Sequence, residues 1–519
     1  MEKSRIKNTI KNVKTGLIVQ LVNKIMAFVV RTVFIRILNS EYLGVNGLFT
    51  NILSMLSFTE LGIGTAIIFN MYKPVAENDK EKIKSLMKLY KISYNIIGVV
   101  IFILGLGVIP FFKYIIKEVP NIHENIKFIY ILFLINTSSS YFFTYKKSII
   151  SAHQQESIIN KIDSFFYLVK SIFEIAFLYL TKNYIVFLIV QIGGTILENI
   201  IIAKKAEVLF PYLKEKNVKK LKKEEYSIIF ANVKALVVYQ FGLAILSGTD
   251  NILISAMVNV ATVGLCSNYT LIITSVKGVV LSAMRGVTAS VGNLNAIETK
   301  EKIEEVFYNL IFVTYLIYVF CTVSFICLLN PFIKIWLGEK FVLNIGIPIA
   351  LAFSFFVCGM RSPAYTYRVT LGLFEKGKTA PYIAAITNVV LSILFCKLWG
   401  VVGIFIATSV AEIVSYSIID PYLIYKYKFK SSMKKYIVKM ARYFLAFSLN
   451  VIICLYLTQL IKYQGYIGLV LKGVCLTIIT LIFNVLLYYK TDEFKYCYDK
   501  FVSSIINRVR KKINREKNQ

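Results

Sequence analysis

Long apolar runs recur along the whole chain and are separated by short polar segments. An α-helix needs about 20 apolar residues to cross the hydrocarbon core of a bilayer. Lipid offers the backbone no hydrogen bonds, so runs of this length favour helices, whose backbone groups pair internally. The pattern predicts an all-α integral membrane protein with about fourteen transmembrane helices, near residues 15–38, 43–71, 92–112, 126–145, 157–180, 184–203, 228–256, 260–291, 306–329, 341–371, 379–397, 402–425, 440–461 and 465–489.

The polar segments between these runs carry their positive charge on alternate sides. With the N-terminus placed in the cytoplasm, the inner segments hold 42 Lys and Arg residues and the outer segments hold 8. Cytoplasmic loops of membrane proteins are enriched in Lys and Arg in this way. The asymmetry predicts that both termini are cytoplasmic and that the basic loops face anionic lipid. Residues 491–519 form a basic tail with apolar residues at helical spacing, as in an interfacial amphipathic helix, and a partner-binding tail is the alternative.

The composition fits this prediction and argues against chemistry in water. Of the 519 residues, 57% are hydrophobic and 17% are charged, whereas a soluble domain carries about 25% charged residues. The net charge of +31 resides largely in the inner loops, so we expect no nucleic-acid partner. The segment GLFEKGKT at 372–379 fits a P-loop pattern, but it lies between membrane helices with no α/β domain around it. With eight scattered cysteines and two histidines in the chain, we expect no metal, no cofactor and no enzymatic activity.

The chain contains an internal repeat with an offset of 220 residues. The segment NVKTGLIVQ at 12–20 matches NVKALVVYQ at 232–240, and the same offset pairs Gly44 with Gly264. Six predicted helices separate the two starts, so both halves begin on the same side of the membrane. This predicts parallel repeats related by an axis along the membrane normal, with the transported species between them. The expected divisions are a six-helix bundle at 1–205, a basic cytoplasmic linker at 206–226, a second six-helix bundle at 227–427, two extra helices at 428–490 and the tail at 491–519.

Polar side chains recur inside the predicted helices at helical spacing. Gln20, Lys24 and Arg31 lie at steps of four and seven, which places them on one helical face. The equivalent region of the second half contains Gln240 and Asn251. The two halves are therefore expected to direct polar stripes at a shared interior.

Further cations make that interior positive. Lys277, Arg285 and Arg361 lie within later helices, and a charge that faces lipid costs about 2.5–3.5 kcal/mol on the mildest scale. We therefore expect these residues to face a cavity that takes an anionic substrate, since Arg makes bidentate contacts with phosphate oxygens. The alternative is that some of the cations lie at helix ends and extend to the interface, which applies most to Arg36, Lys234 and Arg368.

Four carboxylates inside the predicted helices are candidates for ion coupling, namely Asp250, Glu60, Asp163 and Glu174. Asp163, Lys170 and Glu174 share one helical face, so an internal ion-pair set is the alternative for this group. A structural role is likewise the alternative for Glu60 and Asp250.

Five segments carry a resemblance to a known family. They are RTVFIRILNSEYLGVNGLFTNILSMLSFTELGIGTAI at 31–67, SAHQQESI at 151–158, GTDNILISAMVNVATVGLCSNYTLI at 248–272, ASVGNLNA at 289–296 and NVVLSILFCKLWGVVGIFIATSVAE at 388–412. Together and in this order they resemble the bacterial polysaccharide flippase family of the multidrug/oligosaccharidyl-lipid/polysaccharide exporter superfamily. The resemblance covers the first twelve predicted helices and much of the last two.

The resemblance implies a flippase that moves polyprenyl-pyrophosphate-linked oligosaccharide repeat units, of the undecaprenyl type, from the cytoplasmic to the outer leaflet by alternating access. The product would be a capsule, an O-antigen or another surface glycan, and the location would be the bacterial cytoplasmic (inner) membrane. It implies membrane lipids and possible polysaccharide polymerase and chain-length proteins as partners. Arg31, Lys277 and Arg285 would contact the pyrophosphate, and the last two helices would offer a groove for the lipid tail.

Two alternatives to the flippase remain. One is a cation-coupled multidrug antiporter of the same superfamily, for which an acidic cavity and twelve helices would be expected. The other is a membrane enzyme of glycan assembly, which usually needs a larger outer loop than any segment here provides.

Overall fold

The computed structural model describes nearly the whole chain. Its described backbone omits Met1 and residues 58–63, 65–67, 69, 154, 216–217, 220, 222, 224, 228, 231–247, 374 and 504–519. Side chains are also left undescribed at residues 2–19, 283, 285–286, 289–290, 293, 296, 375 and 501–503.

The described chain is helical throughout its regular structure, so the prediction of an all-α fold is confirmed. Eleven of the described helices are long and apolar enough to cross a bilayer, which makes this a multi-pass membrane protein. The predicted helix near 228–256, and the second part of the one near 43–71, fall largely outside the described residues. The described residues form two compact units, Met1–Ser267 and Asn268–Gln519, and the domain boundaries predicted from the sequence remain predictions.

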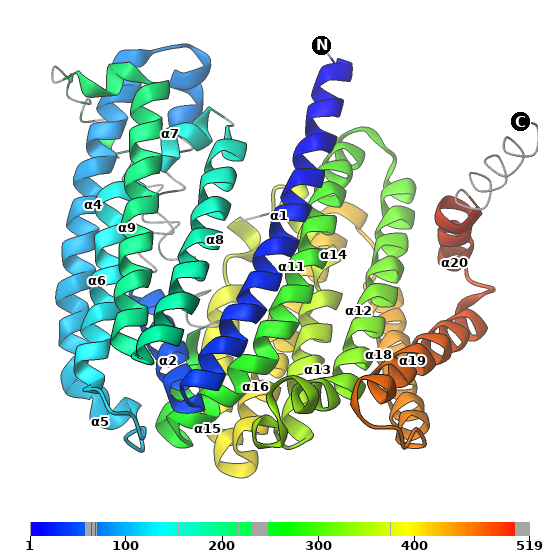
Figure 1. Cartoon of the computed structure of the whole chain (residues 1–519). Helices are drawn as coiled ribbons and strands as arrows, with labels where there is room; N and C mark the ends of the chain where they lie inside the picture. Colours follow the sequence, from blue (N-terminus) through cyan, green and yellow to red (C-terminus); the bar gives the residue numbers. More distant parts are fainter. Residues whose placement is uncertain are drawn as a thin grey trace, which may run out of the picture. The chain divides into compact units, whose positions relative to one another are not determined.

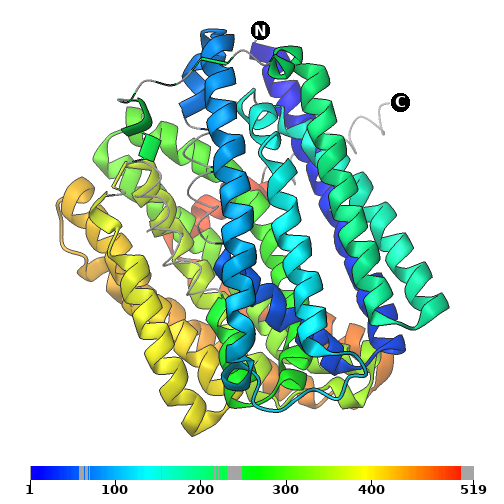
Figure 2. The same cartoon turned by 90° about the vertical axis from the view of Figure 1, so that its left-hand side faces the viewer.

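The first unit is a bundle whose long helices are α1 (Glu2–Ile37), α2 (Ser40–Leu56), α4 (Lys80–Val108), α6 (Ile126–Thr144), α8 (Glu156–Thr181) and α9 (Tyr184–Leu209). Helix α1 packs along α8, and α8 packs along α9 (Figure 1). Helix α6 packs against both α4 and α9, and these three helices run side by side (Figure 2). Short helical segments complete the unit, namely η1 (Ile109–Phe111), α5 (Phe112–Ile115), α7 (Lys147–Ala152) and η2 (Pro211–Lys214).

Polar residues between the apolar runs start these helices. The Asn39 side chain accepts hydrogen bonds from the backbone N–H groups of Glu41 and Tyr42, at 2.9 and 3.2 Å, at the start of α2. Asp79, Asn125 and Asn183 cap α4, α6 and α9 in the same manner. Such caps satisfy backbone donors that have no partner within the helix. The short polar segments therefore fix where each membrane helix begins.

A close helix crossing in the first unit reproduces the sequence repeat. Helix α2 meets the first turns of α11 (Val260–Ile297) with almost no space between the backbones. A Cβ atom added at Gly44 would lie 2.0 Å from the carbonyl oxygen of Val260, and one added at Gly264 would lie 2.1 Å from that of Ser40. The repeat offset relates Gly44 to Gly264 and Ser40 to Val260. Equivalent positions thus exchange the same contact, as a two-fold relation between the repeats requires.

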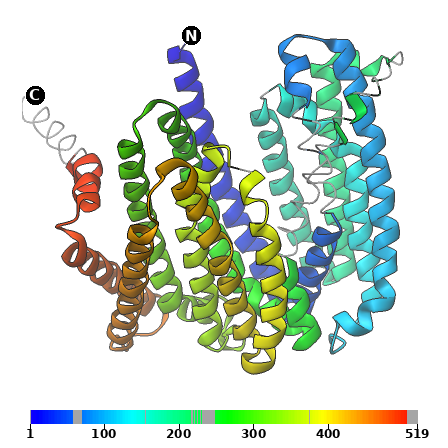
Figure 3. The same cartoon turned by 180° about the vertical axis from the view of Figure 1, so that it is seen from behind.

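The second unit is built around α12 (Lys300–Leu337), much of which is buried. Helix α12 packs against α13 (Gly346–Met360), α18 (Lys434–Gln459) and α19 (Gly465–Tyr488). Helix α16 (Val401–Val414) packs against α13 and α15, and Figure 3 shows α16 and α18 in yellow and orange. The remaining elements are α14 (Ser362–Thr370), α15 (Ala380–Trp399), α17 (Tyr416–Ile424), α20 (Asp492–Cys497), η3 (Glu339–Phe341), η4 (Glu375–Gly377), η5 (Tyr425–Phe429) and η6 (Tyr498–Ser503).

Candidate functional site

Arg31 lies in the apolar part of α1, six residues before the helix ends. Its side chain is half-buried and its Nη1 donates a hydrogen bond of 2.8 Å to the Ser267 hydroxyl on α11. That hydroxyl in turn donates to the Gly264 carbonyl at 2.7 Å. No carboxylate of a described residue lies within ion-pair distance of Arg31. Arg31 is therefore a half-buried cation held by a neutral partner, without a described counterion, in a helix that the sequence predicts to cross the membrane.

The rest of the predicted stripe on α1 is more accessible. Lys24 is half-buried and Gln20 is exposed, so the face that carries Arg31 becomes more open toward the start of the helix. Asn251 is half-buried, and its side-chain nitrogen would lie 3.9 Å from a Cβ atom at Gly47 of α2. Gln240 lies outside the described residues.

Lys277 and Arg285 belong to the part of α11 that lies in the second unit. Lys277 is half-buried, and no carboxylate of the described part of the chain forms an ion pair with it. The helical backbone at Arg285 is described, whereas its side chain is not. The predicted roles of both residues remain predictions.

Arg361 differs from Arg31 because it has a counterion. Its Nη1 lies 2.9 Å from Oε2 of Glu412 on α16, and the guanidinium carbon lies 4.0 Å from the ring centroid of Tyr416. Arg361 stands at the point where α13 ends and α14 begins, and the break between α16 and α17 falls at Ser415. The charge on Arg361 is balanced by Glu412 within its own unit, and its predicted role in substrate binding remains a prediction.

A second buried ion pair lies close by in sequence, between α14 and α17. The Nε of Arg368 lies 2.8 Å from Oδ1 of Asp420, and the two side chains are 2% and 0% exposed. Arg368 is therefore buried, and the alternative in which it extends to the interface from a helix end is wrong. Sequence reasoning missed both Glu412 and Asp420 as partners. The available signal was that these two carboxylates stand within one apolar run, at 402–425.

The carboxylates proposed for ion coupling have different surroundings. Asp163 lies 3.2 Å from the Lys147 amine, which also lies 3.5 Å from Glu198. Lys147 therefore pairs with Asp163, a role that the sequence pattern gave to Lys170. Glu174 is buried at 5% exposure, and no described cation lies within ion-pair distance of it.

The other two coupling candidates are less defined. Asp250 is half-buried and has an interacting partner, and Glu60 lies outside the described residues. Among the described residues no group of three His, Cys, Asp or Glu side chains could hold a metal ion.

A series of apolar cavities follows α19 in the second unit. One, of about 410 Å³, lies between α12 and α19 and is lined by Phe320, Leu328 and Val474. A second, of about 680 Å³, adjoins it at Val474 and extends to the end of α18 at Leu460. A third, of about 230 Å³, shares Leu328 with the first. Together they form an apolar groove between the last two long helices and α12, which we call the α19 groove.

Comparison with known proteins identifies the fold. No protein-family model and no curated protein sequence matches the chain. Among solved structures, the lipid II flippase MurJ in an inward closed conformation is similar over 92% of this chain and 99% of its own, with a TM-score of 0.67 and 18% identity. An inward-facing multidrug resistance MATE transporter of the MOP superfamily is similar over 78% of this chain and 96% of its own, with a TM-score of 0.62 and 15% identity. The eukaryotic MATE transporter AtDTX14 is similar over 81% and 96%, with a TM-score of 0.53 and 11% identity.

These neighbours are named as a lipid II flippase and as MATE transporters, and the chain has their fold. The fold implied by the resemblance is therefore confirmed, including its all-helical membrane architecture.

Proposed function

We propose that this protein is a flippase for polyprenyl-pyrophosphate-linked oligosaccharide repeat units, which it moves from the cytoplasmic to the outer leaflet by alternating access. The observation that carries the proposal is Arg31, a half-buried cation in a membrane helix whose described partner is a neutral hydroxyl. The cargo would serve the export of a surface polysaccharide such as a capsule or O-antigen. The site of action would be the bacterial cytoplasmic membrane, with both termini inside.

Arg31 favours an anionic cargo for an energetic reason. A charged side chain in a membrane helix costs about 2.5–3.5 kcal/mol even on the mildest scale. Arg361 and Arg368 offset this cost with carboxylates at 2.9 and 2.8 Å, whereas Arg31 has no such described partner. A guanidinium also presents several N–H donors in one plane, which matches phosphate oxygens better than an ammonium does. Arg31 thus has the charge and geometry to receive a pyrophosphate, and we assign Lys277 and Arg285 to the same cargo as further cations.

The α19 groove supports a lipid-linked cargo. Its lining residues are mainly apolar and its cavities adjoin one another at Leu328 and Val474. An isoprenoid tail could lie there at little cost, because the lining is as apolar as the lipid chains that the tail leaves. The similarity to MurJ, which is named a lipid II flippase, also extends over 92% of this chain, while the two MATE structures above cover 78% and 81%. This difference in coverage favours a flippase over a drug antiporter.

A cation-coupled drug antiporter is the second candidate, because the MATE likeness and the buried Glu174 favour it. Such a transporter would bind cationic drugs and would need free carboxylates at its binding site. Asp163, Glu412 and Asp420 are instead paired with Lys147, Arg361 and Arg368.

Polysaccharide polymerase and chain-length proteins are further proposed partners of the flippase.

The proposal is tested by reconstituting the protein in vesicles with a fluorescent polyprenyl-pyrophosphate oligosaccharide and measuring its transfer between leaflets. Arg31→Ala removes charge-assisted contacts worth about 1.5–3 kcal/mol, so transfer at limiting substrate should fall about tenfold to a hundredfold. The matched control is Arg36→Ala, since Arg36 is exposed in the last turn of the same helix. Transfer by Arg31→Ala at the rate of Arg36→Ala would reject the assignment. Transport of cationic drugs with no transfer of the lipid-linked sugar would favour the antiporter instead.

A further inference from the structure

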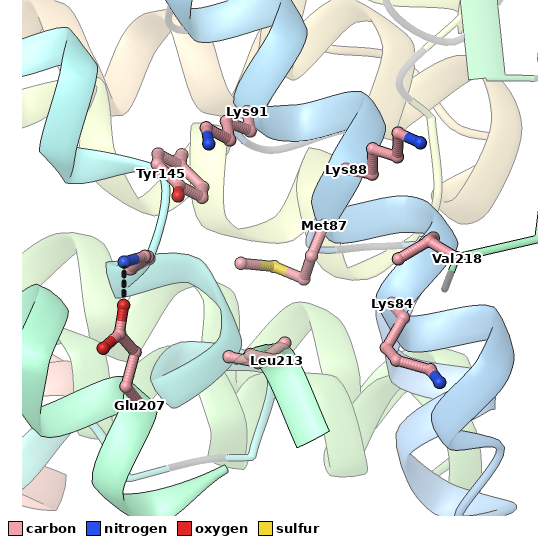
Figure 4. A pocket seen from close by; sticks show the side chains of 9 residues that line it. Lys84, Met87, Lys88, Lys91, Tyr145, Glu207, Leu213 and Val218 are labelled. Carbon is pink, nitrogen blue, oxygen red and sulfur yellow. Dashed lines mark hydrogen bonds and ion pairs between the residues drawn. The ribbon is translucent and has the colours of Figure 1, made fainter. Parts of the chain in front are cut away.

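A polar cavity lies in the first unit, at the end that carries the basic loops. It has a volume of about 250 Å³ and opens between α4, the turn that joins α6 to α7, the end of α9, and η2 (Figure 4). Its lining includes four lysines and one carboxylate. None of the residues predicted from the sequence to bind substrate or ions lines it, so it is distinct from the site around Arg31.

The lysines of this cavity divide into two classes. Lys84 is buried and its amine lies 2.7 Å from Glu215 and also contacts Glu81. Lys146 pairs with Glu207, as the dashed line in Figure 4 marks. These two lysines are neutralised and hold the walls of the cavity together.

Lys88 and Lys91 are different, because both are exposed and neither pairs with a carboxylate of the described chain. They follow Lys84 at steps of four and three, so the three side chains occupy one face of α4. Figure 4 shows Lys88 and Lys91 on one side of Met87, with Leu213 on the other. The cavity therefore combines two positive charges that have no described carboxylate partner with an apolar floor.

The position of Lys88 on α4 relates this cavity to the membrane. The same helical face continues from Lys88 through apolar side chains at steps of three or four, all exposed, namely Ile92, Ile96, Val99 and Ile103. An exposed apolar stripe on a membrane-spanning helix faces lipid, and Lys88 marks where that stripe becomes basic. By the loop charges this is the cytoplasmic end. Lys88 and Lys91 thus lie at the depth of the lipid headgroups, next to the apolar stripe of α4 that faces the acyl chains.

We propose that this cavity binds the phosphate of an anionic membrane phospholipid, with Lys88 and Lys91 as its ligands and the acyl chains along Ile92 and Ile96. Basic pockets between membrane helices on the cytoplasmic side are suited to such headgroups. Met87 and Leu213 contact the glycerol region, and the paired Lys84 and Lys146 keep the pocket open without competing for the phosphate. The site is separate from the transport cargo and would let the membrane's lipid composition act on the first unit.

The test uses the purified full-length protein in detergent, with no oligosaccharide substrate present, so it is independent of the flippase proposal. Native mass spectrometry would measure retention of phosphatidylglycerol and of phosphatidylcholine by the wild type and by Lys88→Ala/Lys91→Ala. Two lysines near the headgroup at about 1 kcal/mol each predict phosphatidylglycerol binding weakened about thirtyfold. The control is Lys204→Ala/Lys205→Ala, which removes two exposed lysines of α9 that do not line the cavity.

Selective loss of phosphatidylglycerol in the Lys88/Lys91 variant alone would support the site. Equal binding by all three proteins would overturn the proposal, because binding would then not depend on the cavity. Equal loss in both double variants would also overturn it, because binding would then depend only on the net charge. Inorganic phosphate that binds through Lys88 and Lys91 while phosphatidylglycerol does not would reject the lipid assignment. If the alanine variant unfolds at lower temperature than the wild type, Lys88→Gln/Lys91→Gln removes both charges, keeps longer polar side chains than alanine and gives the same decision.

Discussion

Adding a single methyl group at the crossing of α2 and α11 should loosen the first unit measurably. In Gly44→Ala the new Cβ would lie 2.0 Å from the Val260 carbonyl oxygen, and real Cβ contacts essentially never fall below 3.0 Å. The obstacle is backbone, which cannot rotate away as a side chain can. The helices would have to separate by about 1 Å, and overpacking of this kind costs about 1–3 kcal/mol. Gly264→Ala should cost a similar amount, because its Cβ would meet the Ser40 carbonyl at 2.1 Å.

The two substitutions share one cause, so their effects should not add. Once the first alanine has separated the helices, the second meets less resistance, and the double variant should lose less stability than the sum of the single losses. Thermal unfolding in detergent measures the loss. Labelling of Cys266, quantified on its own peptide, measures the separation directly, since this thiol is 1% exposed and lies two residues beyond Gly264.

Gly193→Ala provides the matched control. Gly193 lies in α9 of the same unit, and a Cβ there would meet nothing within 4 Å. Alanine at that position should be neutral or slightly stabilising, by up to about 1 kcal/mol from its better helix propensity. If Gly44→Ala unfolds and labels like Gly193→Ala, the backbones are not in contact at Gly44, and the two-fold exchange of contacts would lose its basis.

Two further substitutions test the buried charges. Asp420→Ala leaves the buried Arg368 without a counterion and should cost about 3–5 kcal/mol of stability, seen as a lower unfolding temperature in detergent. The double change Arg368→Met/Asp420→Leu should recover most of that stability. An unaltered unfolding temperature in Asp420→Ala would show that the pair does not form. Glu174→Gln should make flipping independent of an imposed proton gradient, because Glu174 is a buried carboxylate without a described ion pair. If the flipping rate of this variant still depends on the gradient, Glu174 has a structural role.

The sequence predicted those features that depend on local pattern. The apolar runs predicted the helices, and the structure then showed that polar residues such as Asn39 and Asn183 cap their starts. The 220-residue offset also identified Gly44 and Gly264 as equivalent before the structure showed that they exchange contacts. Local periodicity and internal similarity are properties of the chain itself, so no knowledge of packing is needed to find them.

The ion pairs could not be predicted, because they depend on how one helix is rotated against another. Arg361 and Glu412 are 51 residues apart and lie on different helices. A helical-spacing rule relates only residues on the same helix, so it could not find this pair. The same limit explains Asp163, for which the spacing favoured Lys170 on its own helix and the structure provides Lys147 from α7. Arg368 was placed near a helix end correctly, yet Asp420 draws it into the interior.

The contrast among the membrane arginines gives the strongest argument about function. Arg361 and Arg368 each lie next to a carboxylate, Glu412 and Asp420, at 2.9 and 2.8 Å. Arg31 cannot reach the nearer helix end easily, because side chains of a helix lean toward its N-terminus, and Arg31 lies six residues before the C-terminal end of α1. In the proposed function the cargo supplies the compensation for this charge that no described carboxylate supplies. The hydroxyl of Ser267 orients the Arg31 guanidinium without neutralising its charge, which is the arrangement that the proposed binding of an anionic cargo requires.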